Sequence, residues 1–150
     1  MKHILFLILG LFLCGAGGIG DPIDDIKVPN DATKNSAQID ELQALADAGD
    51  YRTVIRKGIP FGKKNKDPRA FNLVAYSYRQ LGQFQKAIKV YKVALKWDPK
   101  LHVAMEYLGV AYLNVGNIDE AKKIYQSLRK EAPKLATALK AEAKKKGINL

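Results

Sequence analysis

Apolar residues recur at helical spacing through most of the chain after residue 36. The clearest cases are segments 70–78 and 104–112, where apolar positions three, one and three residues apart fall on one side of a helix. After each segment comes a glycine, Gly82 or Gly116, and then a second apolar stripe of the same kind. Glycine tolerates the positive φ angle at which a helix ends and the chain reverses. The pattern therefore predicts pairs of antiparallel helices and an all-α fold.

The two helix pairs are copies of one unit. A shift of the sequence against itself by 34 residues brings identical residues into register at structural positions. The prolines at the end of each unit fit this organisation, because proline continues a helix poorly and starts one well. A fixed period of this length indicates a repeat architecture. The identical pairs are Ala70/Ala104, Tyr78/Tyr112, Gly82/Gly116, Ala87/Ala121, Tyr91/Tyr125 and Pro99/Pro133.

Weaker patterns flank these units. Upstream, an apolar stripe over residues 39–46 precedes a glycine, and a helix starting at Tyr51 then meets Gly58, Pro60 and Gly62, so we expect it to be short or kinked. Downstream, alternating Ala, Leu and Lys favour a solvent-facing capping helix. Two repeats alone seldom bury enough surface, so both flanks should complete the core. The predicted organisation is a degenerate repeat over 36–66, full repeats over 67–100 and 101–134, and a capping helix and tail over 135–150.

These units resemble the tetratricopeptide repeat. The segments LVAYSYRQLGQF and MEYLGVAYLNVGN carry the family's aromatic and glycine positions, while Phe71 or Met105 stands for its Trp and Leu128 replaces a small Ala. The same segments are similar to small exported repeat proteins of proteobacteria. The resemblance implies an α-solenoid of antiparallel helix-turn-helix repeats that serves as a non-catalytic scaffold for protein–protein interaction.

The resemblance also implies where a protein or peptide partner binds, namely on the concave face formed by the first helix of each repeat. Amphipathic tyrosines are common anchors in such grooves, and an asparagine amide there could bond an extended peptide backbone. An alternative stays open, in which some of these side chains, together with Leu73, only pack between repeats. A chaperone-tail clamp is absent, because its Lys and Asn positions hold other residues. The expected partner-binding residues are Asn72, Tyr76, Arg79, Glu106, Tyr107, Val110 and Asn114.

Charge is distributed unevenly along the chain. Residues 21–50 carry a net charge of −6 and residues 51–150 a net charge of +15. The first part of the acidic segment, 21–35, has prolines and no periodicity, so we expect a flexible arm. A basic stripe recurs every three or four residues on one helix, and a solvated surface is its favoured interpretation. The alternative function is a basic docking module for an anionic envelope surface or an acidic partner. The stripe consists of Lys86, Lys89, Lys92 and Lys96.

Residues 1–20 read as a secretory signal peptide. Lys2 precedes an apolar run over residues 4–13, and small residues follow. The run is too short to span a bilayer comfortably, which favours a cleaved leader and export to the periplasm or outside the cell. A lipoprotein is less favoured, because Leu13 precedes Cys14 where lipid attachment requires Gly or Ala. Nucleic-acid binding fits the charge but conflicts with export, so none is expected.

The sequence offers no set of residues for catalysis. After the leader, His102 is the only histidine, and no Cys, His or paired carboxylates stand near it in the sequence. The G-x4-G-K-[ST] phosphate loop is also absent. We therefore expect no enzyme activity, metal or cofactor, and membrane contact only through the leader or the basic surface. A second copy of the chain is left open as a partner, and Trp97 is expected to pack against the following repeat.

Overall fold

The computed structural model describes residues 30–150, with side chains from residue 35 onward, and this part of the chain is all-α. The expected leader and residues 21–29 of the expected arm lie outside the described residues. The seven helices of the described part are α1 (Asn30–Asp47), α2 (Tyr51–Asn65), α3 (Pro68–Gln80), α4 (Phe84–Trp97), α5 (His102–Asn114), α6 (Ile118–Glu131) and α7 (Pro133–Lys145).

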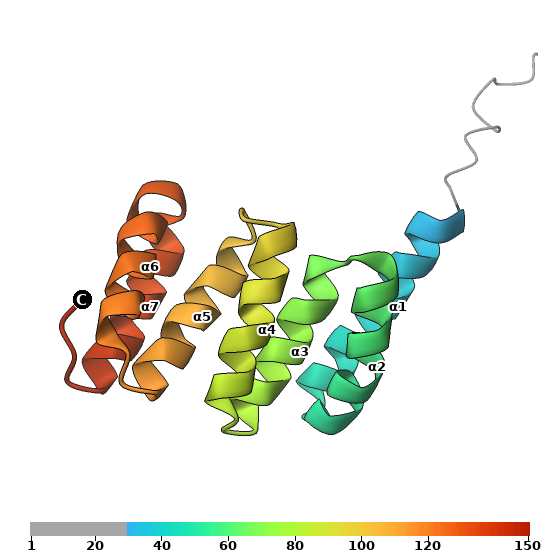
Figure 1. Cartoon of the computed structure of the whole chain (residues 1–150), viewed down its shortest axis with the longest axis horizontal. Helices are drawn as coiled ribbons and strands as arrows, with labels where there is room; N and C mark the ends of the chain where they lie inside the picture. Colours follow the sequence, from blue (N-terminus) through green and yellow to red (C-terminus); the bar gives the residue numbers. More distant parts are fainter. Residues whose placement is uncertain (1–29) are drawn as a thin grey trace, which may run out of the picture.

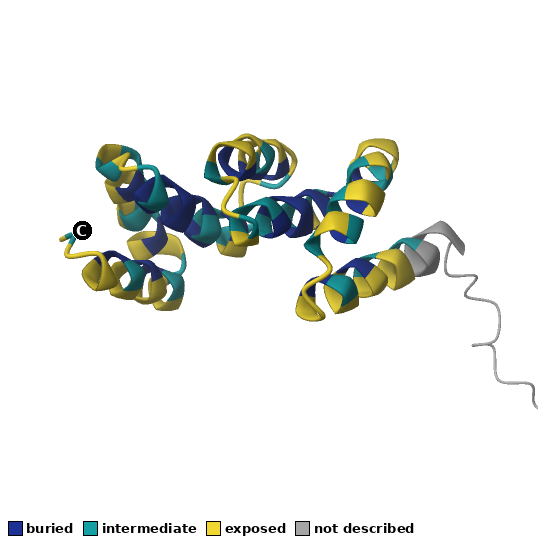
Figure 2. Ribbon diagram, turned by 90° about the horizontal axis from the view of Figure 1, so that it is seen from below, coloured by how far each residue is buried: buried dark blue, intermediate teal, exposed yellow. Residues whose placement is uncertain are grey.

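The helices pack in chain order as adjacent pairs, and α7 contacts both α5 and α6. Figure 1 looks onto α2, α4 and α6, which lie in front along the length of an elongated stack. In the view from below, α3 and α5 lie in the middle, with α2, α4 and α6 on one side and α1 and α7 at the two ends of the other (Figure 2). We call α2, α4 and α6 the outer layer and the opposite side the inner face. The predicted all-α repeat architecture is confirmed.

Helix starts and ends follow local sequence signals. Asp50 accepts a hydrogen bond from the Thr53 N–H at 3.1 Å, and Asp67 accepts one from the Arg69 N–H at 2.9 Å. Each carboxylate thereby satisfies a backbone donor that the first helical turn leaves unpaired. Gly82 and Gly116 have φ angles of 71° and 75°, as their predicted role at the helix ends requires.

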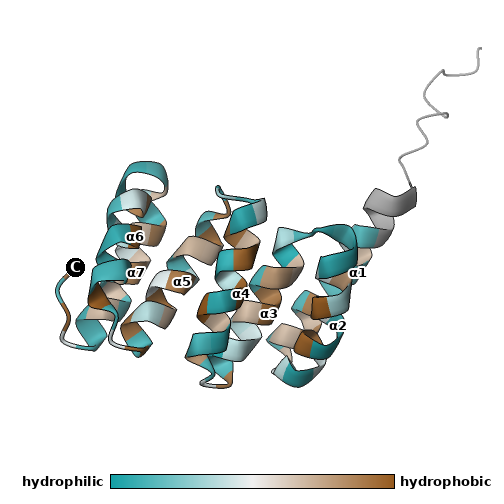
Figure 3. Ribbon diagram, viewed as in Figure 1, coloured by the Kyte–Doolittle hydropathy of each residue, from teal (hydrophilic) through white to brown (hydrophobic). Residues whose placement is uncertain are grey.

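The apolar stripes form two clusters of buried side chains. The smaller cluster joins α1, α2 and α3 around Leu42, Val54 and Leu73. The larger runs from α3 to α7 and includes Tyr91 and Leu128, both fully buried. α7 contributes one apolar face, Ala136, Leu139 and Ala143, to this cluster. Figure 3 shows how hydropathy is distributed over the helices. Hydrophilic residues cover much of the outer layer, and hydrophobic residues lie where helices meet.

Two expectations about the elements differ from the structure. α1 begins at Asn30, so the last part of the arm expected over 21–35 is helical. α2 is not short, because it continues through Pro60 to Asn65. Its glycines serve close packing instead: a Cβ at Gly58 would lie 2.6 Å from Val74 Cγ2, and one at Gly62 would lie 2.8 Å from Phe71 Cε2. Glycine here lets α2 approach α3 rather than ending the helix.

Trp97 packs on an aromatic ring of α3. Its ring meets Phe71 edge to face, with centroids 4.9 Å apart and an interplanar angle of 76°. Phe71 belongs to the same repeat, so this ring contact lies within the unit that contains Trp97. The indole remains 37% exposed on the outer layer.

Candidate functional site

Tyr76 and Tyr107, the two expected anchors, lie together at the junction of the full repeats. Their ring centroids are 5.6 Å apart, and the rings are tilted by 44°. Tyr51 of α2 meets Tyr76 at 6.2 Å, and Tyr91 of α4 meets Tyr107 at 6.3 Å. Four helices thus contribute to one aromatic row. Burial raises the pKa of both Tyr91 and Tyr107, so these phenols stay neutral at physiological pH.

Arg79 is part of the same junction. Its Cζ atom lies 5.1 Å from the centroids of both the Tyr76 and the Tyr107 ring. The guanidinium is therefore attracted to the faces of two rings from successive repeats. Its Nε and the Tyr91 hydroxyl oxygen are buried without a hydrogen-bond partner among the described residues. Arg79 was expected to contact a partner, and the structure places it against these tyrosines.

A hollow of about 200 Å³ opens beside the tyrosine pair on the inner face. Helices α1, α3 and α5 all supply its walls. Asn72 Oδ1 is buried there without a hydrogen-bond partner among the described residues. Val103, by contrast, is 40% exposed at its edge. The lining residues are Gln43, Asp47, Asn72, Leu73, Tyr76, Val103 and Tyr107.

Four of the hollow's residues fell outside the set predicted from the sequence, and one of them, Leu73, was expected only to pack between repeats. Gln43 and Asp47 come from the degenerate repeat, where the Gln43 amide donates to the Asp47 carboxylate at 2.8 Å. Their spacing of four residues on one helix face was the available signal. Val103 occupies a contact position of the family motif, and its exposure is what distinguishes it from its buried neighbours on α5.

Besides Arg79, three predicted residues lie outside the hollow. Val110 is 5% exposed and belongs to the core cluster that α7 completes, so it cannot line an open groove. Asn114 donates to the Val110 carbonyl oxygen at 2.8 Å and accepts from Lys146 Nζ at 3.0 Å. Glu106 is 7% exposed. The physical reason is the packing of α7 against α5, which covers the part of the inner face these residues occupy.

Glu106 is nevertheless electrostatically unusual. Burial penalises the charged carboxylate and raises its pKa to about 7, which Arg79 opposes and Glu142 of α7 reinforces. Part of the population is therefore protonated at neutral pH. The side chain lies at the contact between the last full repeat and the capping helix, so its ionisation should affect the stability of that contact.

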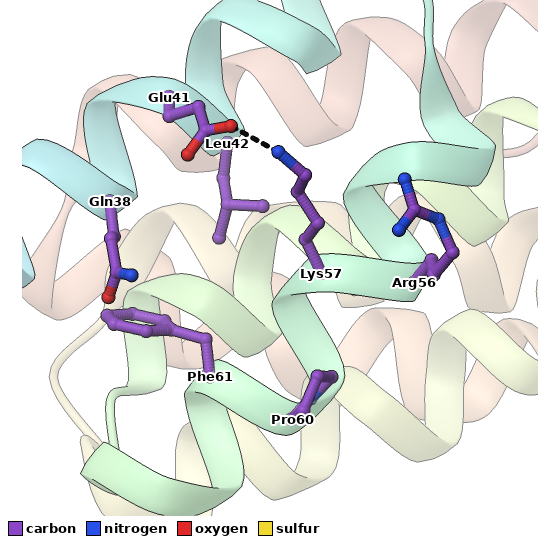
Figure 4. Close-up of a pocket in the computed structure, with 7 residues that line it drawn as sticks. All are labelled: Gln38, Glu41, Leu42, Arg56, Lys57, Pro60 and Phe61. Atoms are coloured by element: carbon purple, nitrogen blue, oxygen red, sulfur yellow. Dashed lines mark hydrogen bonds and ion pairs between the residues drawn. The ribbon is translucent and has the colours of Figure 1, made fainter.

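A second hollow, of about 390 Å³, lies between α1 and α2. In Figure 4, Phe61 and Gln38 lie on one side of it, and Lys57 reaches Glu41 to form an ion pair. No pattern in the sequence pointed to this site. Its residues are Gln38, Glu41, Leu42, Arg56, Lys57, Pro60 and Phe61.

The predicted basic stripe is exposed along α4, on the outer layer. Two of its lysines also contact aromatic rings. Lys86 Nζ lies 5.6 Å from the Tyr78 ring centroid, and Lys92 Nζ lies 5.8 Å from that of Tyr112. Lys89 and Lys96 make no such contact within the described residues.

The residues that could carry other chemistry are few. His102 Nε2 lies 3.0 Å from Glu131 Oε2, so this histidine joins the ends of two helices. Over residues 35–150, no group of three or more His, Cys, Asp and Glu side chains is arranged to hold a metal ion. None of the helices that the structure describes has the length and apolar character needed to cross a membrane.

The paired helices, the turn glycines and the 34-residue period agree with the sequence comparison, in which residues 78–144 match the family model for the tetratricopeptide repeat. Residues 78–144 are a tetratricopeptide-repeat region. The region extends from the end of α3 through α7, so it includes Val103 and Tyr107 but not Asn72 or Tyr76. No curated protein matches the chain. Tetratricopeptide repeats generally act as protein–protein interaction modules and are typically non-catalytic.

Proposed function

We propose that this chain is a non-catalytic scaffold that binds an extended peptide segment of a partner protein in the inner-face hollow. The observation that carries the proposal is the pairing of Tyr76 and Tyr107 beside an unpaired acceptor, Asn72 Oδ1. A turn of the Asn72 amide toward the hollow would let a peptide backbone N–H donate to this oxygen, which would remove the cost of leaving a buried acceptor unsatisfied. An apolar peptide side chain could cover Val103, which is otherwise 40% exposed.

The junction supports recognition of a peptide in a fixed orientation. Arg79 lies against the tyrosine pair, so part of the hollow's wall is ordered before a ligand arrives. Pre-ordered aromatic side chains lose little conformational entropy on binding and commonly act as hot spots. The hollow is small, and it therefore suits one anchoring side chain, with the backbone on either side running along the inner face.

The test is selection from a phage-displayed library of random peptides, followed by fluorescence anisotropy with the selected peptides. Val103→Glu introduces a charge at the edge of the hollow, and we expect it to weaken binding by about tenfold or more. Asn72→Leu removes the acceptor, and a loss of about three- to tenfold is expected. Val93→Glu makes the same change at a residue of nearly equal exposure on the outer layer, and it should leave peptide affinity unchanged.

Two results would refute this site. The first is that selected peptides bind the Val103→Glu and wild-type proteins equally. The second is that Val93→Glu weakens binding as much as Val103→Glu does. Circular dichroism of each variant checks that the helices remain folded, so that loss of binding reflects the hollow and not unfolding.

We also propose that residues 1–20 direct export, so that the partner lies in the periplasm or outside the cell. The composition of this segment, a positive charge followed by an apolar run and small residues, supports the proposal. Residues 1–35 fused to a reporter enzyme that is active only after export should yield activity. Replacement of the apolar residues at 6–9 by Ser and Asn should abolish that activity, and equal activity of the two fusions would contradict export.

A further inference from the structure

Positive charge is concentrated in the outer layer. Helices α2 and α4 together carry nine Lys and Arg residues and not one Asp or Glu. All nine side chains are exposed. Lys57 pairs with Glu41, and none of the other eight forms an ion pair with an acidic side chain among the described residues. The nine are Arg52, Arg56, Lys57, Lys63, Lys64, Lys86, Lys89, Lys92 and Lys96.

Apolar side chains are exposed within this basic surface. Val93 is 38% exposed and Trp97 is 37% exposed, and both belong to α4. At 100° per residue, Val93 projects between Lys86 and Lys89 around the helix. Large exposed apolar side chains next to unpaired cations are typical of surfaces that meet an amphipathic partner.

Trp97 is held in place at the end of this surface. Its ring packs edge to face on Phe71, and Phe71 in turn fills the space beside Gly62 of α2. The ends of α2 and α4 are thereby connected through α3. The indole is fixed at the outer surface near the basic ends of two helices, with its remaining exposed area directed to solvent.

We propose that the outer surface of α2 and α4 docks on an anionic lipid bilayer. The partner follows from charge complementarity, since eight unpaired cations without a neighbouring carboxylate in either helix match an anionic surface. The cations extend along α4 for about 15 Å, which mobile lipid headgroups can follow without a matching rigid shape. Trp97 and Val93 would enter the interfacial region, where tryptophan is enriched. The surface lies opposite the inner-face hollow and functions independently of it.

The test uses the full chain and vesicles of phosphatidylcholine with 0–40% phosphatidylglycerol, measured by sedimentation. Trp97 is the only tryptophan of the chain, so its emission reports this surface alone. Binding should rise steeply with phosphatidylglycerol and fall in high salt. Trp97 emission should shift to shorter wavelength and be quenched by brominated lipid. An apolar leader that inserts by itself would leave the emission unquenched.

Two matched pairs of lysine variants test whether vesicle binding depends on this surface or only on the net charge of the chain. Each lysine near an anionic membrane contributes about a fivefold factor in partitioning. Lys89→Gln with Lys96→Gln should therefore lower partitioning by about 20- to 30-fold. Lys140→Gln with Lys144→Gln removes the same charge from exposed positions on α7. This pair should change vesicle partitioning by less than about threefold. Val93→Glu should also weaken vesicle binding, whereas Val103→Glu should not.

The proposal is overturned if the two lysine pairs have equal effects, if binding is independent of phosphatidylglycerol, or if Trp97 stays unquenched on bound vesicles. It is likewise overturned if poly-glutamate shifts the Trp97 emission while anionic vesicles do not, because the partner would then be an acidic protein. Failure of the peptide site would appear in the Val103→Glu experiment, so the two proposals can fail separately.

Discussion

Gly109 of α5 and Leu139 of α7 lie so close that a Cβ atom at position 109 would be 2.6 Å from Leu139 Cδ2. Leu139 is fully buried, and Ile124 Cγ2 would be 3.4 Å from the same Cβ. The glycine therefore allows the capping helix to seat on the last full repeat. The equivalent position in the preceding repeat is Ala75, which shows that a methyl group is accommodated where no capping helix follows.

Gly109→Ala should destabilise the protein despite better helix propensity. Crowding of a packed core costs about 1–3 kcal/mol, whereas the propensity gain is at most about 1 kcal/mol. We expect the free energy of unfolding in urea to fall by about 1 kcal/mol. Combination with Leu139→Ala should show a coupling of about 0.5–3 kcal/mol. Strict additivity of the two changes would contradict the close contact.

Pro60→Ala should stabilise α2. Proline has no N–H, so the carbonyl of Arg56 lacks its helical donor. Pro60 is exposed, so its replacement by Ala leaves no buried cavity. Proline costs about 3 kcal/mol in a helix interior, partly offset by its restriction of the unfolded chain. We expect a gain of about 1–2 kcal/mol, read as a higher thermal midpoint.

Gly58→Ala is the contrasting change in the same helix. Alanine has a higher helix propensity than glycine, but its Cβ at position 58 would lie 2.6 Å from Val74 Cγ2 in the buried interface. This variant should lose stability while Pro60→Ala gains it. A gain in both would mean that packing between α2 and α3 tolerates the extra methyl group.

The repeat organisation could be predicted from the sequence because its signals are local. Gly82 and Gly116 each end a helix with positive φ, and the apolar stripes between them report burial directly. Gly58 and Gly62 show the limit of this reasoning. A glycine reads as a helix breaker in the sequence, and only the position of Val74 or Phe71 across the interface shows that it permits close packing instead.

The candidate site could be predicted only in part, for a similar reason. The contact positions of the repeat motif correctly predicted that Tyr76 and Tyr107 lie together, because the first helices of successive repeats are neighbours. The same positions also selected Val110 and Asn114, which the capping helix covers or engages. Whether a position on the inner face is open depends on what packs after it, and no signal within the repeat contains that information.

Arg79→Lys should weaken the junction between the full repeats. A lysine ammonium is a point charge that cannot cover both tyrosine rings as the planar guanidinium does. We expect a loss of about 0.5–1.5 kcal/mol in the free energy of unfolding. The control is Arg129→Lys, since Arg129 is exposed and faces only the Tyr125 ring, at 5.9 Å. Equal losses at both positions would show that contact with two rings adds nothing.

Glu106 should make stability fall as the pH rises from about 4.5 to about 7. Its pKa is raised by burial from 4.5 to about 7, so the folded chain binds the proton more tightly than the unfolded chain. Below 4.5 the carboxyl group is protonated in both states and carries no penalty. Above about 7 the folded state must bury a carboxylate, and the penalty reaches its full value, on the order of 1–3 kcal/mol.

Glu106→Gln tests this assignment, because glutamine keeps the shape of the side chain and cannot ionise. Urea unfolding should give nearly equal stabilities for variant and wild type at pH 4.5, with the variant more stable by about 1–3 kcal/mol at pH 8. Glu142→Gln removes a neighbouring negative charge that raises the Glu106 pKa, so it should move the wild-type transition to lower pH. A stability difference that is the same at both pH values would show that Glu106 does not titrate in this range. The packing of α7 on α5 would then be independent of its charge.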